Sequence, residues 1–158
     1  GFVDEELDEL APLVRALHED CRSLAEYPVP EMPVNPEFRR SNVRRDQDGW
    51  KILNWPDVTI SHPFFSAQEF LRSTGLSGNP VNGVRDAYLD PFAVYDDPGR
   101  LGQAFELAGR LQPAWNLLRW SSQLDHIEPE SVAAAAKARV MQRICRNLMH
   151  EHGQRNHN

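Results

Sequence analysis

The sequence predicts a mainly α-helical domain that carries one short β-hairpin. Apolar residues recur at steps of three and four near both ends of the chain, which is the spacing of a buried helical face. In the first third of the chain, a turn sequence ending in Asp48-Gly49 separates two short strand-like runs. A chain of 158 residues is the usual length of one domain, so we expect a single domain over residues 1–150 and a polar, disordered tail over 151–158.

The first helix is predicted to begin at Asp4, because Asp4, Glu5 and Glu6 place negative charge where the helix dipole favours it. Three prolines between Tyr27 and Pro33 end it, since proline cannot continue a helix. Its predicted apolar face consists of Leu7, Leu10, Val14, Leu17, Cys21 and Leu24.

The predicted hairpin pairs residues 42–45 with residues 50–55 across the turn at residues 46–49. An isolated hairpin is only marginally stable, so we expect it to pack on the helices. A helix follows Pro63, with Ser66 as its N-cap and Glu69 as the capping-box partner.

That helix is predicted to end near Gly75, before a loop over residues 76–83. Residues 84–95 form a helix candidate that Pro91 divides into two pieces. Residues 96–99 cap a further helix from about Arg100, which Pro113 is expected to kink or break. The apolar face of this helix is predicted to contain Leu101, Phe105, Ala108 and Leu111.

The last helix is predicted to carry Pro129 in its first turn, where proline costs no hydrogen bond. Its apolar face steps by four residues through Val132, Ala136, Val140, Ile144 and Leu148.

The net charge of −6 argues against nucleic acid or anionic lipid as a partner. No apolar run approaches the roughly 20 residues that span a bilayer. The acidic start does not resemble a signal peptide, so we expect a cytoplasmic protein. Cys21 and Cys145 each lie in a helical apolar pattern and are expected to be buried, reduced thiols.

Three pieces of sequence point to a family. They read Asn-Pro-Glu-Phe-Arg-Arg-Ser-Asn-Val from Asn35, Gly-Trp-Lys-Ile-Leu-Asn-Trp-Pro-Asp from Gly49, and Ser-His-Pro-Phe-Phe from Ser61. Their order and spacing resemble the catalytic core of the aminoglycoside phosphotransferase family. There a His-Gly-Asp-x-His-x-x-Asn loop precedes a hairpin, an Ile-Asp-Trp segment and a Gly-His-Pro-type segment. The resemblance implies a kinase-like C-terminal helical lobe, with the N-terminal lobe of that family absent.

Phosphoryl transfer needs a carboxylate that positions the accepting hydroxyl and oxygen ligands for Mg²⁺. By the resemblance, Glu37 takes the place of the catalytic aspartate, and Asn42 matches the metal-binding asparagine. Asn54 stands where the family has a metal-binding aspartate, so a neutral amide replaces an anionic ligand. The longer side chain of Glu37 moves its carboxylate by roughly an ångström, which can cost about 10²-fold in rate. Asn35 and Arg39 replace the two histidines of the loop.

The resemblance therefore implies a degenerate phosphotransferase-like domain that is non-catalytic by itself and acts as a binding module. No cofactor is expected in this form, because Gly-rich phosphate loops are lacking and the only lysines are Lys51 and Lys137. Two alternatives remain. The chain is a fragment or subunit of an active small-molecule kinase that uses ATP and Mg²⁺, or it is an unrelated small helical domain.

Several residues have a structural and a functional interpretation. The basic cluster Arg39, Arg40, Arg44 and Arg45 is either a solvated hairpin edge or a site for phosphate or an acidic partner, with Arg39 and Arg40 as the candidate phosphate ligands. His62 is expected to be a hydrogen-bonded structural histidine. Core positions rather than a stacking platform are predicted for Trp50, Trp55, Phe64 and Phe65.

The face around the predicted catalytic loop and hairpin is covered by the N-terminal lobe in the family. Here a surface bearing Met32, Phe38 and Trp50 would be left open. We expect a homodimer or another protein partner to cover this face, with no membrane contact.

Overall fold

The computed structural model describes residues 4–124, 128 and 130–155. These residues are mainly helical, which confirms the predicted fold class. The chain divides into two compact units: Leu24–Arg110 form one, and Gly1–Ser23 with Leu111–Asn158 form the other. The prediction of one domain over residues 1–150 stays a prediction.

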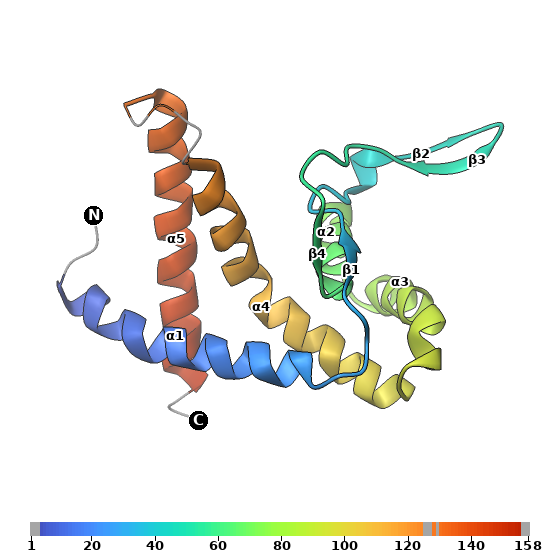
Figure 1. Ribbon diagram of the computed structural model, residues 1–158, viewed down its shortest axis with the longest axis horizontal. Helices are drawn as coiled ribbons and strands as arrows, with labels where there is room; N and C mark the ends of the chain where they lie inside the picture. The colour runs from blue at the N-terminus through green and yellow to red at the C-terminus, as the bar shows by residue number, and fades with distance from the viewer. Residues whose placement is uncertain (1–3, 125–127, 129, 156–158) are drawn as a thin grey trace. The chain divides into compact units, whose positions relative to one another are not determined.

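The unit that holds both ends of the chain is built from helices α1 (Asp4–Ala25), the second part of α4 (Pro98–Leu124) and α5 (Val132–Arg155), drawn in Figure 1. Its core gathers apolar side chains from all three helices. The buried members are Leu13, Leu148 and Met149, and the partly buried members are Leu10, Leu17, Ala114, Leu117 and Ile144.

The predicted face of α1 was partly wrong. Val14 is 52% exposed and Cys21 is exposed, whereas Leu13 is buried. Leu10, Leu13, Leu17 and Leu24 also follow steps of three and four, so two overlapping faces were available. Packing on α4 and α5 selects the face that contains Leu13.

Ser131 caps α5, because its hydroxyl accepts a hydrogen bond from the Ala134 N–H at 3.1 Å. The predicted role of Pro129 lies outside the described residues. On the predicted face of α5, Leu148 is buried but Val132 is exposed. The helix continues to Arg155, so the predicted tail begins as helix; residues 156–158 lie outside the described part.

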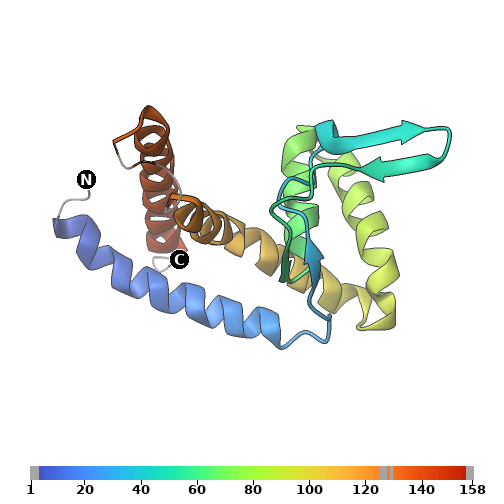
Figure 2. The same ribbon diagram turned by 45° about the horizontal axis from the view of Figure 1, so that its top comes forward.

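The other unit contains the predicted hairpin. Strand β2 (Val43–Asp46) pairs antiparallel with β3 (Gly49–Ile52), and Val43 lies opposite Ile52. Figure 2 shows the two strands side by side, joined at a tight turn. Gly49 has a φ of 118°, which explains why glycine follows aspartate in this turn.

The hairpin does not pack on the helices as expected. All residues from Trp50 to Ile60 are exposed, and the hairpin extends away from helix α2 (Phe64–Thr74) in Figures 1 and 2. The predicted core positions of Trp50 and Trp55 are therefore wrong, whereas Phe64 and Phe65 are buried.

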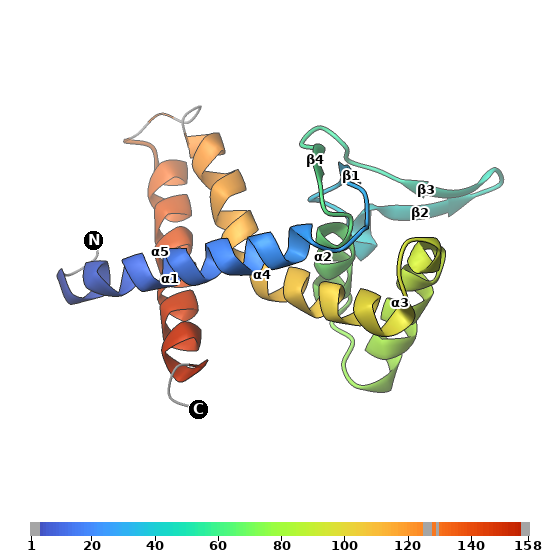
Figure 3. The same ribbon diagram turned by 60° about the horizontal axis from the view of Figure 1, so that its bottom comes forward.

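A second two-stranded sheet was not predicted. Strand β1 (Met32–Val34) pairs antiparallel with β4 (Thr59–Ser61), and both lie beside α2 in Figures 1 and 3. Each strand has three residues, and β1 contains Pro33, so neither shows the alternation that signals a strand.

The core of this unit is centred on Phe64, which is fully buried. Its ring centroid lies 5.2 Å from that of Phe92 and 5.7 Å from that of Phe105. Phe105 belongs to α4, where Leu101, Phe105, Ala108 and Leu111 are all buried as predicted.

Several helix boundaries differ from the prediction. Helix α3 (Asn79–Leu89) begins inside the predicted loop, with Pro80 in its first turn. It is followed by a separate 3₁₀-helix η2 (Asp90–Val94), which confirms the division at Pro91. Asp97 caps α4 as expected, since its Oδ1 accepts the Arg100 N–H at 3.0 Å, and α4 continues through Pro113 without a break.

Cys21 and Cys145 are both free thiols, but only Cys145 is partly buried. The expectation of two buried thiols was therefore wrong for Cys21. Among the described residues, no helix combines the length and the apolar character that crossing a bilayer requires.

Candidate functional site

The segment that carries the resemblance is anchored by Asn35, which is 3% exposed. Its backbone N–H donates to the Ser66 hydroxyl at 3.0 Å, and its side-chain amide donates to the Leu53 carbonyl at 3.4 Å. Its Oδ1 accepts the Glu37 N–H at 2.8 Å, which closes a turn. Asn35 therefore ties the end of β1 to α2 and to the segment after β3. We call residues 35–42 the Asn35 loop.

Ser66 and Glu69 do not form the predicted capping box. Helix α2 begins at Phe64 after Pro63, so Ser66 lies inside its first turn. The Ser66 hydroxyl bonds to Asn35, and Glu69 pairs with Arg39 and Arg72. The competing long-range partners were not visible in the sequence, because they are about 30 residues away.

Arg39 lies between two carboxylates. Its Nε is 2.7 Å from Oε1 of Glu69 and 3.5 Å from Oε2 of Glu37. Glu69 is 4% exposed, so the guanidinium supplies charge that a buried carboxylate requires. Arg39, which was predicted as a phosphate ligand, thus holds the Asn35 loop against α2 through its ion pair with Glu69.

Asn42 ends the 3₁₀-helix η1 (Arg40–Asn42) and closes the Asn35 loop. Its side-chain amide donates to the Glu37 carbonyl at 2.8 Å, and its own carbonyl accepts the Leu53 N–H at 2.8 Å. The structure therefore brings Glu37 and Asn42 together with Leu53, the residue before Asn54.

Asn54 is exposed and has a φ of 64°, in the left-handed region. Asparagine is among the few residues that adopt this conformation with modest strain. The position is thus explained by backbone geometry without invoking a metal.

The donor set fits Mg²⁺ poorly. Neither predicted ligand, Asn42 or Asn54, is a carboxylate; the one carboxylate of the predicted site is Glu37, in the catalytic position, and the Arg39 guanidinium lies against it. Asn42 and Asn54 offer neutral amide oxygens, whereas Mg²⁺ in such sites is held by carboxylates and phosphates. No cluster of three or more His, Cys, Asp or Glu side chains suited to a metal occurs among the described residues.

His62 follows β4 and is partly buried. Its Nδ1 accepts the Phe64 N–H at 3.4 Å, and its ring lies edge-on to Phe64 at 4.6 Å. Burial lowers the pKa of His62 to about 4. The predicted structural role is compatible with these contacts, although Nε2 is buried and has no hydrogen-bond partner among the described residues.

Exposed apolar residues follow the Asn35 loop, and sequence reasoning missed most of them. Two of them stand out, because Trp50 is 70% and Ile60 is 63% exposed. We call the set the apolar strip; its members are Trp50, Ile52, Leu53, Trp55, Val58 and Ile60. The alternation of apolar and charged residues in the hairpin was the signal that could have revealed the first members of the apolar strip, Trp50 and Ile52.

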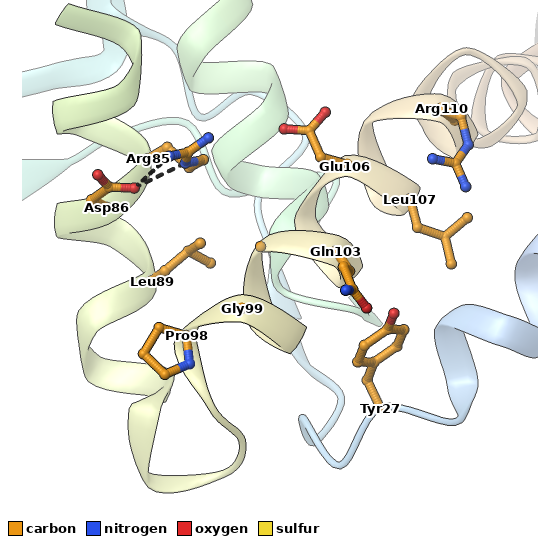
Figure 4. Close-up of a pocket in the computed structure, with 11 residues that line it drawn as sticks. Tyr27, Arg85, Asp86, Leu89, Pro98, Gly99, Gln103, Glu106, Leu107 and Arg110 are labelled. Carbon is orange, nitrogen blue, oxygen red and sulfur yellow. Dashed lines mark hydrogen bonds and ion pairs between the residues drawn. The ribbon is translucent and has the colours of Figure 1, made fainter. Parts of the chain in front are cut away.

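Figure 4 shows a pocket on one face of the first part of α4, with α3 on one side and Tyr27 on the other. Its volume is about 530 Å³. Arg85 is already paired with Asp86 at 2.8 Å, and Tyr27 lies under the Arg100 guanidinium at 5.0 Å. None of the predicted site residues lines this pocket.

Comparisons with protein-family models, with curated proteins and with solved structures found no match to this chain.

Proposed function

We propose that this chain is a phosphotransferase-like domain that does not catalyse phosphoryl transfer by itself and acts as a protein-binding module. One observation carries the proposal: eleven consecutive residues, from Trp50 to Ile60, are exposed, and the six members of the apolar strip lie among them. Exposed apolar surface of this kind usually marks an interaction site.

The contacts of the Asn35 loop support the non-catalytic half of the proposal. Glu37 lies against Arg39, and Asn42 uses its amide to hold the loop. A catalytic carboxylate has to reach the accepting hydroxyl, and a metal ligand has to present an oxygen. The Glu37 carboxylate and the Asn42 amide nitrogen instead contact other residues of the loop, which Arg39 joins to α2.

The partner is either a second copy of this chain or another protein that covers the apolar strip. The two free cysteines are in keeping with a reducing compartment such as the cytoplasm. In the alternative, an active kinase that uses ATP and Mg²⁺, the Glu37 carboxylate would have to leave Arg39, whereas Asn42 could keep its bond to the Glu37 carbonyl and present Oδ1 to the metal.

The catalytic half is tested by calorimetry with ATP, in the presence and absence of Mg²⁺, together with a phosphate-release assay. We expect no Mg²⁺-dependent heat and equal rates for the natural chain and Glu37→Gln. Turnover that Glu37→Gln abolishes would establish the kinase alternative instead.

Whether the partner is a second copy of the chain is tested by sedimentation velocity at micromolar concentration. Trp50→Ser removes the most exposed member of the apolar strip, and Val94→Ser removes an even more exposed apolar residue elsewhere in the same unit. If a second copy covers the strip, the mass of the natural chain exceeds that of a monomer, and only Trp50→Ser lowers it.

A further inference from the structure

We infer that hairpin β2–β3 binds an extended, acidic segment of another protein as an added strand. This inference rests on the proposed function and names the chemistry of the partner. Within the described residues, the sheet consists of β2 and β3 alone, so the outer edge of neither strand is paired with a further strand. Such edges present unpaired backbone groups that can accept an additional strand.

The hairpin has two different faces. In an antiparallel pair, opposite residues share a face and neighbours along a strand alternate. The register therefore places Val43, Arg45, Trp50 and Ile52 on one face, and Arg44, Asp46 and Lys51 on the other. An added strand that alternates apolar and acidic residues would continue both faces.

The charges of the hairpin favour an acidic partner. Arg39 and Lys51 are paired with carboxylates, Lys51 with Asp46 at 2.5 Å. Arg40, Arg44 and Arg45 have no carboxylate partner among the described residues. Arg45 instead lies over the Trp50 ring at 5.6 Å. Arg44 and Arg45 therefore supply one guanidinium group to each face of β2, in a chain of net charge −6.

If the arginines served only to prevent aggregation at the hairpin edge, the exposure of Trp50 would have no explanation. Charged side chains alone are enough to prevent strands from pairing at random. Here Trp50 and Ile52 are exposed on the same face as Arg45, and the apolar strip continues to Ile60. Burial of this surface would contribute to the binding of a protein strand.

A second copy of the chain fits the edge less well. Antiparallel pairing of β2 with its own copy across a two-fold axis at the centre of the strand would place Arg44 opposite Arg45 of the other copy. Like charges directly opposite each other destabilise a sheet. A nucleic acid is also disfavoured, because the net charge of −6 repels phosphates.

The test uses the full chain and two fluorescently labelled peptides of about eight residues, the length of an ordinary strand. One peptide alternates Glu and Val, and the control alternates Lys and Val. Fluorescence anisotropy should show binding of the Glu-Val peptide alone, weakening as salt is added. Arg44→Glu should weaken this binding by about tenfold. The matched charge reversal Arg139→Glu, at an exposed position of α5, should change it by less than about twofold.

Arg44→Glu should retain the hairpin, because the new carboxylate would lie opposite Lys51. Equal binding of both peptides, unchanged binding by Arg44→Glu, or no binding of the Glu-Val peptide would overturn the inference. So would displacement of the peptide by a single-stranded oligonucleotide. None of these results affects the calorimetric test of the proposed function, and Mg²⁺-dependent ATP turnover would refute that function without involving the peptide.

Discussion

The Nε of Arg39 lies 2.7 Å from Oε1 of Glu69, and this ion pair joins the Asn35 loop to α2. Arg39 is partly exposed, whereas Glu69 is almost completely buried. The carboxylate therefore depends on Arg39 and Arg72 for its charge to be tolerated, while either arginine could be solvated alone.

Glu69→Gln should destabilise the chain by about 1–3 kcal/mol, because it removes charged hydrogen bonds at a buried position. Glu31→Gln, at an exposed position of the same unit, should stay within about 0.5 kcal/mol. Urea unfolding followed by circular dichroism measures both. Equal stabilities for the two variants would mean that the ion pair contributes nothing to the fold.

The pKa of His62, lowered from 6.5 to about 4 by burial, predicts a dependence of stability on pH. The unfolded state binds the proton more tightly, so the contribution is complete above pH 6.5 and is lost as the pH falls toward 4. Discounted for partial exposure, the loss should be about 1 kcal/mol between about pH 7 and pH 5. Unfolding of the natural chain and of His62→Gln at several pH values measures it; a parallel pH dependence in both would assign the effect to other groups.

The sequence predicted the helical class, the hairpin and the cap at Asp97 because each depends on neighbours in the chain. Asp-Gly defines the turn between β2 and β3, and Asp97 lies three residues before the N–H that it accepts. The face of α1 and the strands β1 and β4 depend on distant packing, so local patterns could not fix them.

The contacts of the candidate site could not be predicted from the sequence. Glu37 and Asn42 lie in one loop, where the Asn42 amide donates to the Glu37 carbonyl, and the roles that the resemblance implies for them stay predictions. The partners of Asn35 and Arg39 come from α2, about 30 residues later, and the capping-box pattern at Ser66 and Glu69 pointed to a different role for them. For Trp50 the two expectations conflicted: the resemblance implied an open surface, whereas its apolar character pointed to a core position, and its exposure shows that the core position was wrong.

Asn54 should tolerate glycine better than alanine. Its φ of 64° is unfavourable for a residue with a Cβ, and asparagine offsets part of that cost. We expect Asn54→Ala to lose about 1 kcal/mol of stability and Asn54→Gly to change it by less than about 0.5 kcal/mol. Thermal and urea unfolding distinguish the two, and a chain that accepts alanine as readily as glycine would show that residue 54 leaves this conformation in solution.

Two glycines of α4 should respond in opposite ways to alanine. Alanine favours a helix interior over glycine by about 0.5–1 kcal/mol. At Gly102, no heavy atom of the described residues lies within 4 Å of an added Cβ, apart from its chain neighbours and the adjacent helix backbone, so Gly102→Ala should stabilise the chain by about that amount. At Gly109, the added Cβ would lie 2.9 Å from Nε2 of Gln68.

The Gln68 side chain donates to the Phe105 carbonyl at 2.8 Å, and Gly109→Ala would force it to move. A lost hydrogen bond of this kind costs about 1 kcal/mol, which offsets the gain in helix propensity. We therefore expect Gly102→Ala to raise the midpoint of urea unfolding and Gly109→Ala to leave it unchanged or lower it. The double variant Gln68→Ala with Gly109→Ala separates the two effects, because alanine at position 109 should be favourable once Gln68 is shortened. If Gly109→Ala raises the midpoint as much as Gly102→Ala does, Gln68 does not pack against α4 as described.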